Sequence, residues 1–377
     1  MAVQETFVDY YQILNIQPTA AAAAVKAAIS TQRRVWIKRQ GSADPARRAE
    51  AEATVRHLRE AEETLLNPQR RRQYDERLRT APESVTAAPD AGSSDWMERA
   101  EAYLAMGNNT AAHRAACEAT TVRGNDHRAW ALRARTSFIG GNNPDAEFEY
   151  AEAIRLDPTV PDYHQDLGEV YGLQEKWPQA MREYTRVLQL DARNPVAQTS
   201  IAQVYLNTDQ AAKALEIMEG VVRENPGNEF FTFYLGAALE ANALAGLTHL
   251  ADDTILATSE AQVQLLERTA TRIAGLRLND PEVAQAIANL RRMAAGSREP
   301  MWVHSRNWQV YAIAIGALMC GSFGGLGSGS GGGIAASLLL FAPLTALIVY
   351  VYVQRHRKPT FEHAARQLAG QVVRRGI

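Results

Sequence analysis

Four basic side chains gather where the first long helical pattern of the sequence ends: Arg33, Arg34, Lys38 and Arg39. Their spacing places them on successive turns near the carboxyl end of a helix, where positive charge interacts favourably with the helix dipole. Such a cluster can dock on an acidic surface of a protein partner. It can equally be the solvated end of a helix, and the residues alone leave both interpretations open.

No set of residues in the sequence is typical of an enzyme or a metal site. The two cysteines, Cys117 and Cys320, lie in very different surroundings, and the eight histidines are scattered without ligand spacing. The glycine run at residues 324–333 lacks the lysine that follows a phosphate-binding loop. We therefore expect no enzymatic activity, no metal and no cofactor.

The composition is that of an ordinary globular chain. With 377 residues, of which 46% are apolar and 22% charged, the chain is too long for one simple core and suggests two or three units. The formal net charge of −2 gives no basic excess, so we expect no nucleic-acid partner. No stretch shows the alternation of a strand, which predicts an all-α fold.

Two apolar runs near the carboxyl end favour a membrane hairpin. Residues 308–325 and 334–353 carry no formal charge, and about 18–20 residues span a bilayer core as a helix. Basic residues on both outer flanks predict that the amino-terminal domains and the tail lie in the cytoplasm, with the protein in the cell membrane. The alternative is a buried hairpin of a soluble domain. A transport role is disfavoured because no charged side chain lies inside the runs. The alanine- and arginine-rich composition suggests a bacterial source.

A repeat of 34 residues follows the amino-terminal part of the chain. The recurring positions are Trp96, Trp130, His164 and Gln198, and, later in each unit, Ala112, Ala146, Ala180 and Ala214. This pattern resembles the tetratricopeptide repeat, in which a small residue lets two helices approach each other closely. The resemblance implies an α-solenoid of four repeats, with a fifth beginning at Glu229.

In this family the first helices of the repeats form a concave face that binds peptides. The residues predicted to point into that groove are Arg128, Arg135, Asp162, Asp166, Glu169, Gln203, Phe230, Phe233 and Tyr234. A basic patch beside an acidic one suggests an extended partner segment of mixed charge, and the alternative is an unoccupied, solvated surface. The positions that grip acidic chaperone tails in the family carry Ala131, Arg135, Asp166, Val196 and Ser200 here, so that clamp is not supported.

The amino-terminal part begins with DYYQIL at residues 9–14 and ends with LLNPQRRRQYD at residues 65–75. Between these motifs lie two helical patterns, the second with an apolar stripe that includes one acidic residue, Glu62. These residues resemble a J-domain, the co-chaperone module that partners DnaK-type chaperones. The resemblance covers about 70 residues, and it implies that the basic face of Arg33, Arg34, Lys38 and Arg39 docks on such a chaperone.

The tripeptide that this family needs to stimulate its partner is missing. In place of His-Pro-Asp the sequence has Ile37, Lys38 and Arg39. The first hypothesis is therefore a membrane-anchored adaptor, in which the repeats bind a protein partner and the J-like unit docks a DnaK-type chaperone or another partner without stimulating it. The alternative is an active co-chaperone that delivers clients to the chaperone through a variant loop.

The predicted organisation follows from these patterns. The domain boundaries are residues 1–79 for the J-like unit, 80–94 for a flexible linker, 95–250 for the repeats, 251–300 for capping helices, 301–353 for two transmembrane helices and 354–377 for a basic cytoplasmic tail. The linker is rich in proline and small residues, as interdomain linkers often are.

Overall fold

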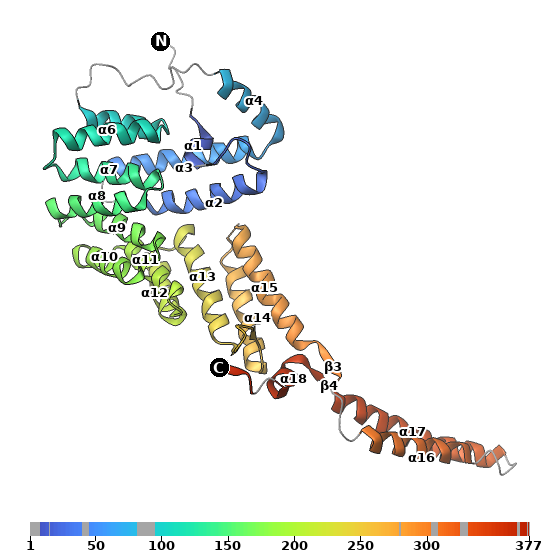
Figure 1. The fold of residues 1–377 in the computed structure, drawn as a ribbon. Coiled ribbons are helices and arrows are strands. Elements are labelled where there is room, and N and C mark those ends of the chain that lie inside the picture. Colours follow the sequence, from blue (N-terminus) through green and yellow to red (C-terminus); the bar gives the residue numbers. More distant parts are fainter. Residues whose placement is uncertain are drawn as a thin grey trace. The chain divides into compact units, whose positions relative to one another are not determined.

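The computed structural model describes residues 8–14, 16–39, 45–80, 95–278, 280–302, 308–324, 331–367, 370–374 and 376. It is dominated by helices (Figure 1). The chain divides into two compact units, Met1–Leu235 and Gly236–Ile377. The prediction of an all-α class is confirmed, although short strands of two or three residues occur in the second unit.

The first unit begins with four helices, referred to below as the N-terminal helices: α1 (Tyr10–Leu14), α2 (Ala22–Arg39), α3 (Pro45–Leu65) and α4 (Pro68–Thr80). The side chain of Asp9 accepts a hydrogen bond from the backbone N–H of Tyr11 (2.9 Å) and so caps α1. At the start of α4 the side chain of Asn67 accepts a hydrogen bond from Gln69 N–H (3.0 Å). Pro68, the first residue of α4, has no N–H that would need a partner.

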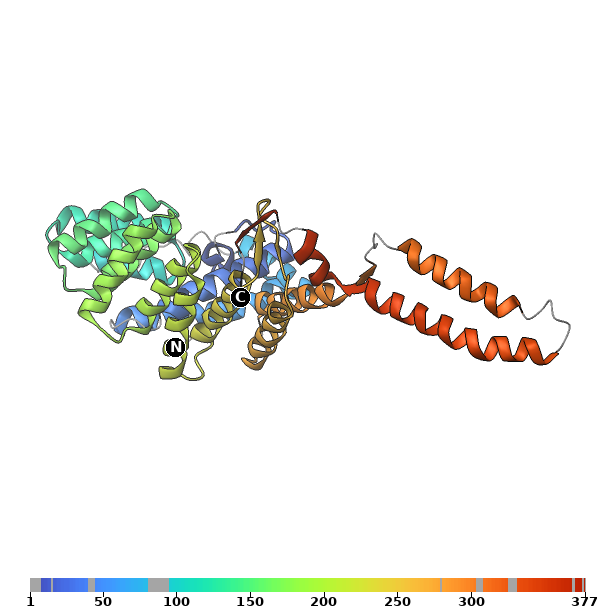
Figure 2. The same cartoon turned by 90° about the horizontal axis from the view of Figure 1, so that it is seen from below.

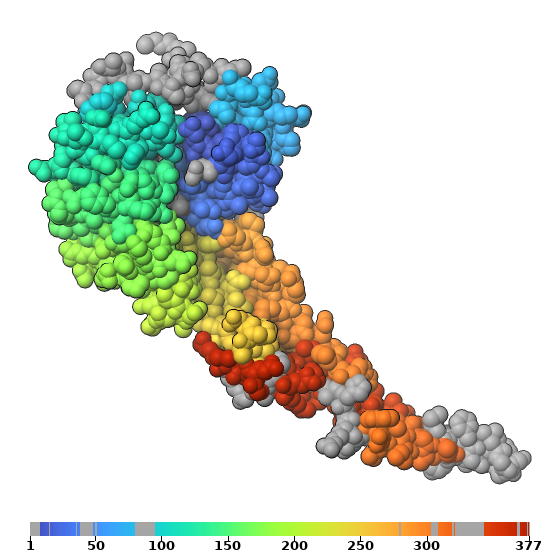
Figure 3. Space-filling model, in the orientation of Figure 1, coloured from blue at the N-terminus to red at the C-terminus, as the bar shows by residue number. Residues whose placement is uncertain are grey.

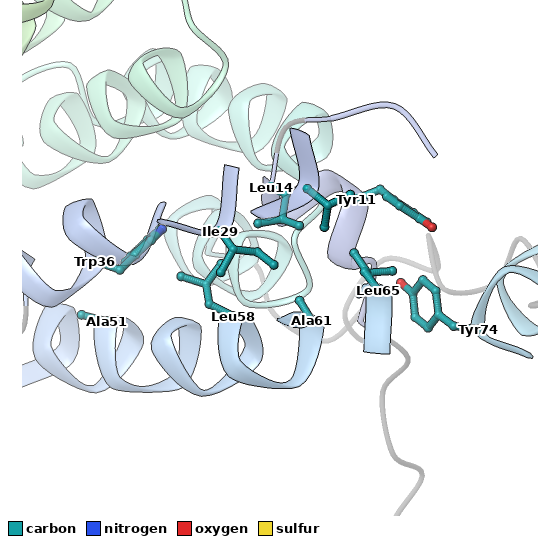
Figure 4. Packing of buried hydrophobic residues seen from close by; sticks show 10 residues of the cluster. Tyr11, Leu14, Ile29, Trp36, Ala51, Leu58, Ala61, Leu65 and Tyr74 are labelled. Carbon is teal, nitrogen blue, oxygen red and sulfur yellow. The ribbon is translucent and has the colours of Figure 1, made fainter. Parts of the chain in front are cut away.

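A small apolar core lies between the N-terminal helices (Figure 4). Its buried members are Tyr11, Leu14, Val25, Ile29, Trp36, Ala51, Leu58, Ala61, Leu65 and Tyr74. Val25 and Ile29 of α2 face Leu58 and Ala61 of α3, because residues three and four apart share one side of a helix. The hairpin of α2 and α3 is therefore packed along one face only and leaves its other face for further contacts.

Polar contacts tie the two ends of this part together. The Tyr74 hydroxyl accepts a hydrogen bond from Tyr10 N–H (2.8 Å) and donates one to the Val8 carbonyl (3.0 Å). The rings of Tyr10 and Tyr74 stack with their centroids 4.9 Å apart. Arg71 donates to the carbonyl oxygens of Pro18 (2.7 Å) and Ala20 (2.8 Å). The motifs at residues 9–14 and 65–75 thus meet in space.

Helices α5 to α13 form a solenoid of antiparallel pairs. The first helices of the pairs are α5 (Trp96–Ala105), α7 (His127–Ile139), α9 (Pro161–Leu173), α11 (Pro195–Asn207) and α13 (Glu229–Ala245), and the second helices are α6 (Asn109–Val122), α8 (Asn143–Leu156), α10 (Trp177–Leu190) and α12 (Ala211–Glu224). All four second helices begin 34 residues apart, which is the predicted period.

Small residues sit where these helices cross. Ala112, Ala146, Ala180 and Ala214 all have 0% relative exposure. At Gly168 of α9 an added Cβ would lie 2.4 Å from Cε1 of Tyr184, whose ring is itself buried. Because a large ring occupies the space that a side chain at residue 168 would need, α9 and α10 can approach each other only with glycine there.

The second unit contains α14 (Glu260–Gly275) and α15 (Pro281–Arg298), which pack against each other. A small sheet has the strand order β2 (Ile255–Leu256), β1 (Thr248–Leu250), β5 (Val372–Arg374), and β3 (Pro300–Trp302) pairs with β4 (Arg357–Pro359). A short helix, α18 (Thr360–Gln367), lies between β4 and β5 in the sequence. The residues predicted to be a basic cytoplasmic tail therefore include two strands, β4, which pairs with β3, and β5, which pairs with β1.

The predicted membrane hairpin is wrong. Its two runs form α16 (Trp308–Gly324) and α17 (Gly331–His356), which lie side by side (Figures 1 and 2). Helix α16 has 17 residues, a rise of about 26 Å, which is less than the roughly 30 Å of a bilayer core. Across the parts of the chain that the structure describes, no helix meets both the length and the apolarity needed to cross a membrane. This overturns the predicted two-span location in a cell membrane.

Candidate functional site

The first helices of the repeats line one face of the solenoid, which we call the groove. In the first unit the hairpin of α2 and α3 lies on this face, and Figure 3 shows the N-terminal helices in blue against the teal and green repeats. Among the residues that the structure describes, three hollows lie between the hairpin and the groove, and their linings show which side chains face one another.

The first hollow lies between α3 and the early repeats and has a volume of about 530 Å³. Arg128 and Arg135 of α7 and Asp162 of α9 line it, and Thr54 and His57 of α3 line its other side. Three residues predicted from the sequence to face the groove are thus brought together. Arg128 forms an ion pair with Asp126 (Nη2–Oδ2 3.1 Å) at the start of its own helix, whereas Arg135 is buried, with 9% exposure.

The second hollow lies between α2 and the later repeats and has a volume of about 300 Å³. Glu169 of α9, Gln203 of α11 and Tyr234 of α13 line it, opposite Thr31 and Arg34 of α2. A carboxylate therefore shares this hollow with a guanidinium from another part of the chain. Opposite charges in a partly enclosed space attract each other more strongly than on an open surface.

The third hollow, of about 260 Å³, joins the apolar ends of the hairpin to the first repeats. Trp36 of α2 lines it together with Phe138 of α7 and Leu173 of α9. Leu173 is 64% exposed. This part of the groove therefore offers apolar surface next to the polar hollows.

An aromatic cluster at the start of α13 receives Arg34. Phe230 and Tyr234 pack edge to face with centroids 5.1 Å apart, and Phe233 and Tyr234 do so at 5.3 Å. The Arg34 guanidinium carbon lies 5.2 Å from the Phe233 ring centroid, within the range of a cation–π interaction. All three aromatic residues were predicted to face the groove, and Phe233 meets a basic side chain of the chain itself.

Asp166, which was also predicted to face the groove, lies half-buried on α9.

The predicted basic face is divided between two environments. Arg33 forms an ion pair with Glu62 of α3 (Nη2–Oε2 2.5 Å), the acidic residue of the otherwise apolar stripe. Arg34 points to the groove. Lys38 and Arg39 belong to the last turn of α2, and their side chains lie outside what the structure describes. The positions of the missing tripeptide therefore continue the helix α2.

A cysteine and a histidine lie close together inside the first repeats. The Sγ atom of Cys117 is 3.6 Å from Nε2 of His113, whose Nδ1 is 3.0 Å from the Thr136 hydroxyl. Burial raises the pKa of the Cys117 thiol, whereas a nucleophilic thiol needs a lowered pKa. The pair therefore fits a structural contact between α6 and α7.

A buried carboxylate, that of Glu149 on α8, forms an ion pair with the partly exposed Arg133 of α7 (Nε–Oε1 2.6 Å). The Ser137 hydroxyl donates a hydrogen bond to the same carboxylate (2.6 Å). Burial raises the pKa of Glu149, and these two partners oppose that rise. No group of three or more potential ligands that could hold a metal ion occurs among the residues of known placement.

Sequence reasoning missed Thr31, Thr54 and His57 on the hairpin side of the hollows, and it assigned Arg34 to a different contact, the docking of a chaperone or another partner. Thr31, Arg34, Thr54 and His57 are polar or charged, and on a helix such residues ordinarily face water. They face the groove instead, because the groove is itself lined by charged and polar side chains. Only a comparison of the two polar faces, one on the hairpin and one on the repeats, would have suggested that they meet.

Comparison with known proteins identifies the repeats. A family model described as a tetratricopeptide repeat matches residues 173–232, and no curated protein matches the chain significantly. The crystal structure of the MamA protein has 18% identity and a TM-score of 0.38, with 47% of this chain and 88% of that chain covered. YrrB, described as a TPR protein with an unusual peptide-binding site, has 13% identity and a TM-score of 0.39, covering 52% and 90%.

PilF of Pseudomonas aeruginosa is similar over 58% of this chain and 96% of its own, with 17% identity and a TM-score of 0.37. At such TM-scores these solved structures carry no argument about binding or activity. The assignment of tetratricopeptide repeats instead rests on the family match and on the spacing of α6, α8, α10 and α12.

Proposed function

We propose that this chain is a non-enzymatic adaptor whose repeats bind a segment of a protein partner in the groove. The observation that supports it most directly is the groove itself, in which charged and aromatic side chains, among them Arg135, Glu169 and Tyr234, face the same side of the solenoid. Solenoids of this kind present large concave surfaces to partners.

The charges and aromatic rings of the groove indicate that the bound segment carries at least one basic side chain, which packs against an aromatic ring of the groove.

The role of the N-terminal helices is part of the same proposal. Their motifs resemble a J-domain without the stimulating tripeptide, so we propose that they dock a DnaK-type chaperone or another protein without stimulating it. One observation supports a docking role over an active one: Ile37 lies within α2 rather than in a loop. An active co-chaperone working through a variant loop has no such support.

A photo-crosslinking experiment on the full chain tests the binding role. A benzoylphenylalanine at Leu173, which is exposed beside two hollows, reports what enters the groove in cells of the source organism. We expect adducts with another protein that are absent when the same probe replaces Phe148, a 58% exposed residue of α8. Adducts confined to the chain's own N-terminal helices would contradict the proposal.

The docking role has a separate test. We expect that adding the full chain leaves the ATP turnover of the organism's DnaK-type proteins unchanged while the two proteins bind. Clear stimulation of turnover, lost on the substitution Arg33→Glu, would instead support the active co-chaperone. Absence of both binding and stimulation would remove the chaperone from the proposal and leave the groove as the binding surface.

A further inference from the structure

The contact between α2 and the groove uses both candidate binding surfaces at once. Arg34 is a member of the basic face that a chaperone would approach, and Phe233 and Glu169 are members of the groove that a partner segment would enter. Each surface therefore covers part of the other. Thr54 and His57 extend the contact along α3 to the hollow lined by Arg135.

We infer that the hairpin of α2 and α3 is an internal ligand of the groove, so that an external partner must displace it. This inference rests on the proposed function and states how the same site is regulated. The occupant is α2 and α3 of the same chain, which are covalently joined to the repeats. While the hairpin is seated, the groove and Arg34 are masked together, and its release exposes both.

The seated hairpin also defines what the groove recognises. The occupant is helical, whereas the sequence suggested an extended segment of mixed charge. Its arginine contacts the face of Phe233, and that ring packs edge to face on Tyr234. An external partner that competes for this position is therefore a helix with an arginine or lysine beside uncharged side chains, such as Thr31 and Trp36 on α2.

The contact between the hairpin and the groove is polar, which suits reversible binding. The second and first hollows, of about 300 and 530 Å³, remain between the hairpin and the repeats, so the two surfaces do not pack as a continuous core. By contrast, the α2–α3 interface itself is closed, with Val25, Leu58 and Ala61 at 0% exposure. The hairpin can therefore leave the groove as one body while its own core stays intact.

Cleavage of the chain between the N-terminal helices and the repeats tests this inference. A specific protease site is placed within residues 81–94, between α4 and α5, in the otherwise complete protein. After cleavage the two pieces are run together on gel filtration over a range of concentrations. We expect the wild-type pieces to co-elute at micromolar concentration, because the seat persists without the covalent connection.

Two variants and two matched controls sharpen the result. Arg34→Glu and Phe233→Ala each remove one side of the cation–π contact, and we expect each to weaken the association of the pieces about tenfold. Arg59→Glu makes the same charge change at an exposed position of α3, and Phe148→Ala removes an exposed ring from α8; both should associate as the wild type does. Circular dichroism of the cut proteins verifies that the variants keep their helices.

Each outcome decides the matter. Separation of the wild-type pieces, or equal association of the wild type and Arg34→Glu, would overturn the internal ligand. A dimer of the uncut protein that is lost on Arg34→Glu would show that the hairpin seats on a second copy, which would overturn an internal seat. The Leu173 crosslinks separate the two proposals. If the pieces separate but Leu173 still crosslinks to another protein, the adaptor role stands and only the internal ligand is overturned. If the pieces co-elute but no other protein is crosslinked, only the adaptor role is contradicted.

Discussion

The N-terminal helices and the repeats are both helical, but they are held together in different ways. In the repeats, size is the main determinant: alanines and Gly168 lie where helices cross, and rings such as Tyr184 fill the space beside them. In the N-terminal helices, Tyr74 and Arg71 bind backbone groups far away in the sequence. The first arrangement depends on shape and recurs with the period, whereas the second depends on a few specific hydrogen bonds.

This difference explains what each region can lose. A repeat that loses its small residue loses the approach of its helices, so its spacing is visible in the sequence. The frame of the N-terminal helices does not depend on residues 37–39, because the contacts of Tyr10, Tyr74 and Arg71 do not involve them. The packing of this region can therefore tolerate changes at those positions.

The largest expected effect comes from closing the space at Gly168. Gly168→Ala places a Cβ 2.4 Å from the Tyr184 ring, so one of the two helices must shift. We expect a loss of about 2 kcal/mol in the free energy of unfolding, measured by denaturant titration with circular dichroism. The matched change Gly220→Ala in α12 meets nothing within 4 Å and should stabilise the protein by about 0.5–1 kcal/mol. Similar effects of the two changes would contradict the argument from shape.

A smaller loss is expected when one hydroxyl is removed from the N-terminal helices. Tyr74→Phe keeps the ring but leaves Tyr10 N–H and the Val8 carbonyl without their shared partner. We expect a loss of about 1–1.5 kcal/mol by the same titration. Gln73→Ala, an exposed neighbour on α4, should change stability by less than about 0.5 kcal/mol. If Tyr74→Phe were as mild as Gln73→Ala, the specific hydrogen bonds would not be what holds this region.

Alkaline pH should weaken the N-terminal helices through Tyr10. Burial, with the Glu60 carboxylate nearby, raises the pKa of Tyr10 to about 12. Because this value exceeds the unfolded pKa of about 10, the contribution of the neutral phenol is complete below about pH 10 and is lost as the pH rises toward 12. The free energy of unfolding of Tyr10→Phe should therefore fall less steeply over this interval than that of the wild type. Parallel curves for the two proteins would show that Tyr10 is not responsible.

The smallest effect is expected at the ion pair of Arg33 and Glu62. Both side chains are more than one third exposed, at 36% and 37%, so water screens their attraction. A double-mutant cycle with Arg33→Ala and Glu62→Ala should give a coupling free energy of about 0.5 kcal/mol. A coupling as large as the loss in Tyr74→Phe would mean that charge, rather than the tyrosine hydrogen bonds, dominates this region.

The repeats were predictable because their packing imposes a period on the sequence. The small residues at 112, 146, 180 and 214 predicted where the second helices lie. The same period then put Arg135, Glu169 and Gln203 on the inner face of the first helices. The occupant of that face was not predictable, since the side of α2 with Thr31 and Arg34 has the composition of a solvated surface.

The error at the carboxyl end has a different cause. Hydropathy alone does not show where a helix begins and ends, and α16 stops at Gly324 after 17 residues. The short strands were missed because two or three residues cannot display an alternating pattern. Strand β5 pairs with β1, more than one hundred residues earlier in the chain, and no local pattern reports such a pairing.

The connection of α4 to α5 through residues 81–94 has a consequence for competition. A ligand joined to its site by a short stretch of chain acts at an effective concentration in the millimolar range. A free helix with the same intrinsic affinity, present at about 1 μM, would then occupy roughly one groove in a thousand. The groove therefore rejects weak helices at ordinary concentrations, and it responds only to a partner that binds far more tightly than α2 or that holds the N-terminal helices at the same time.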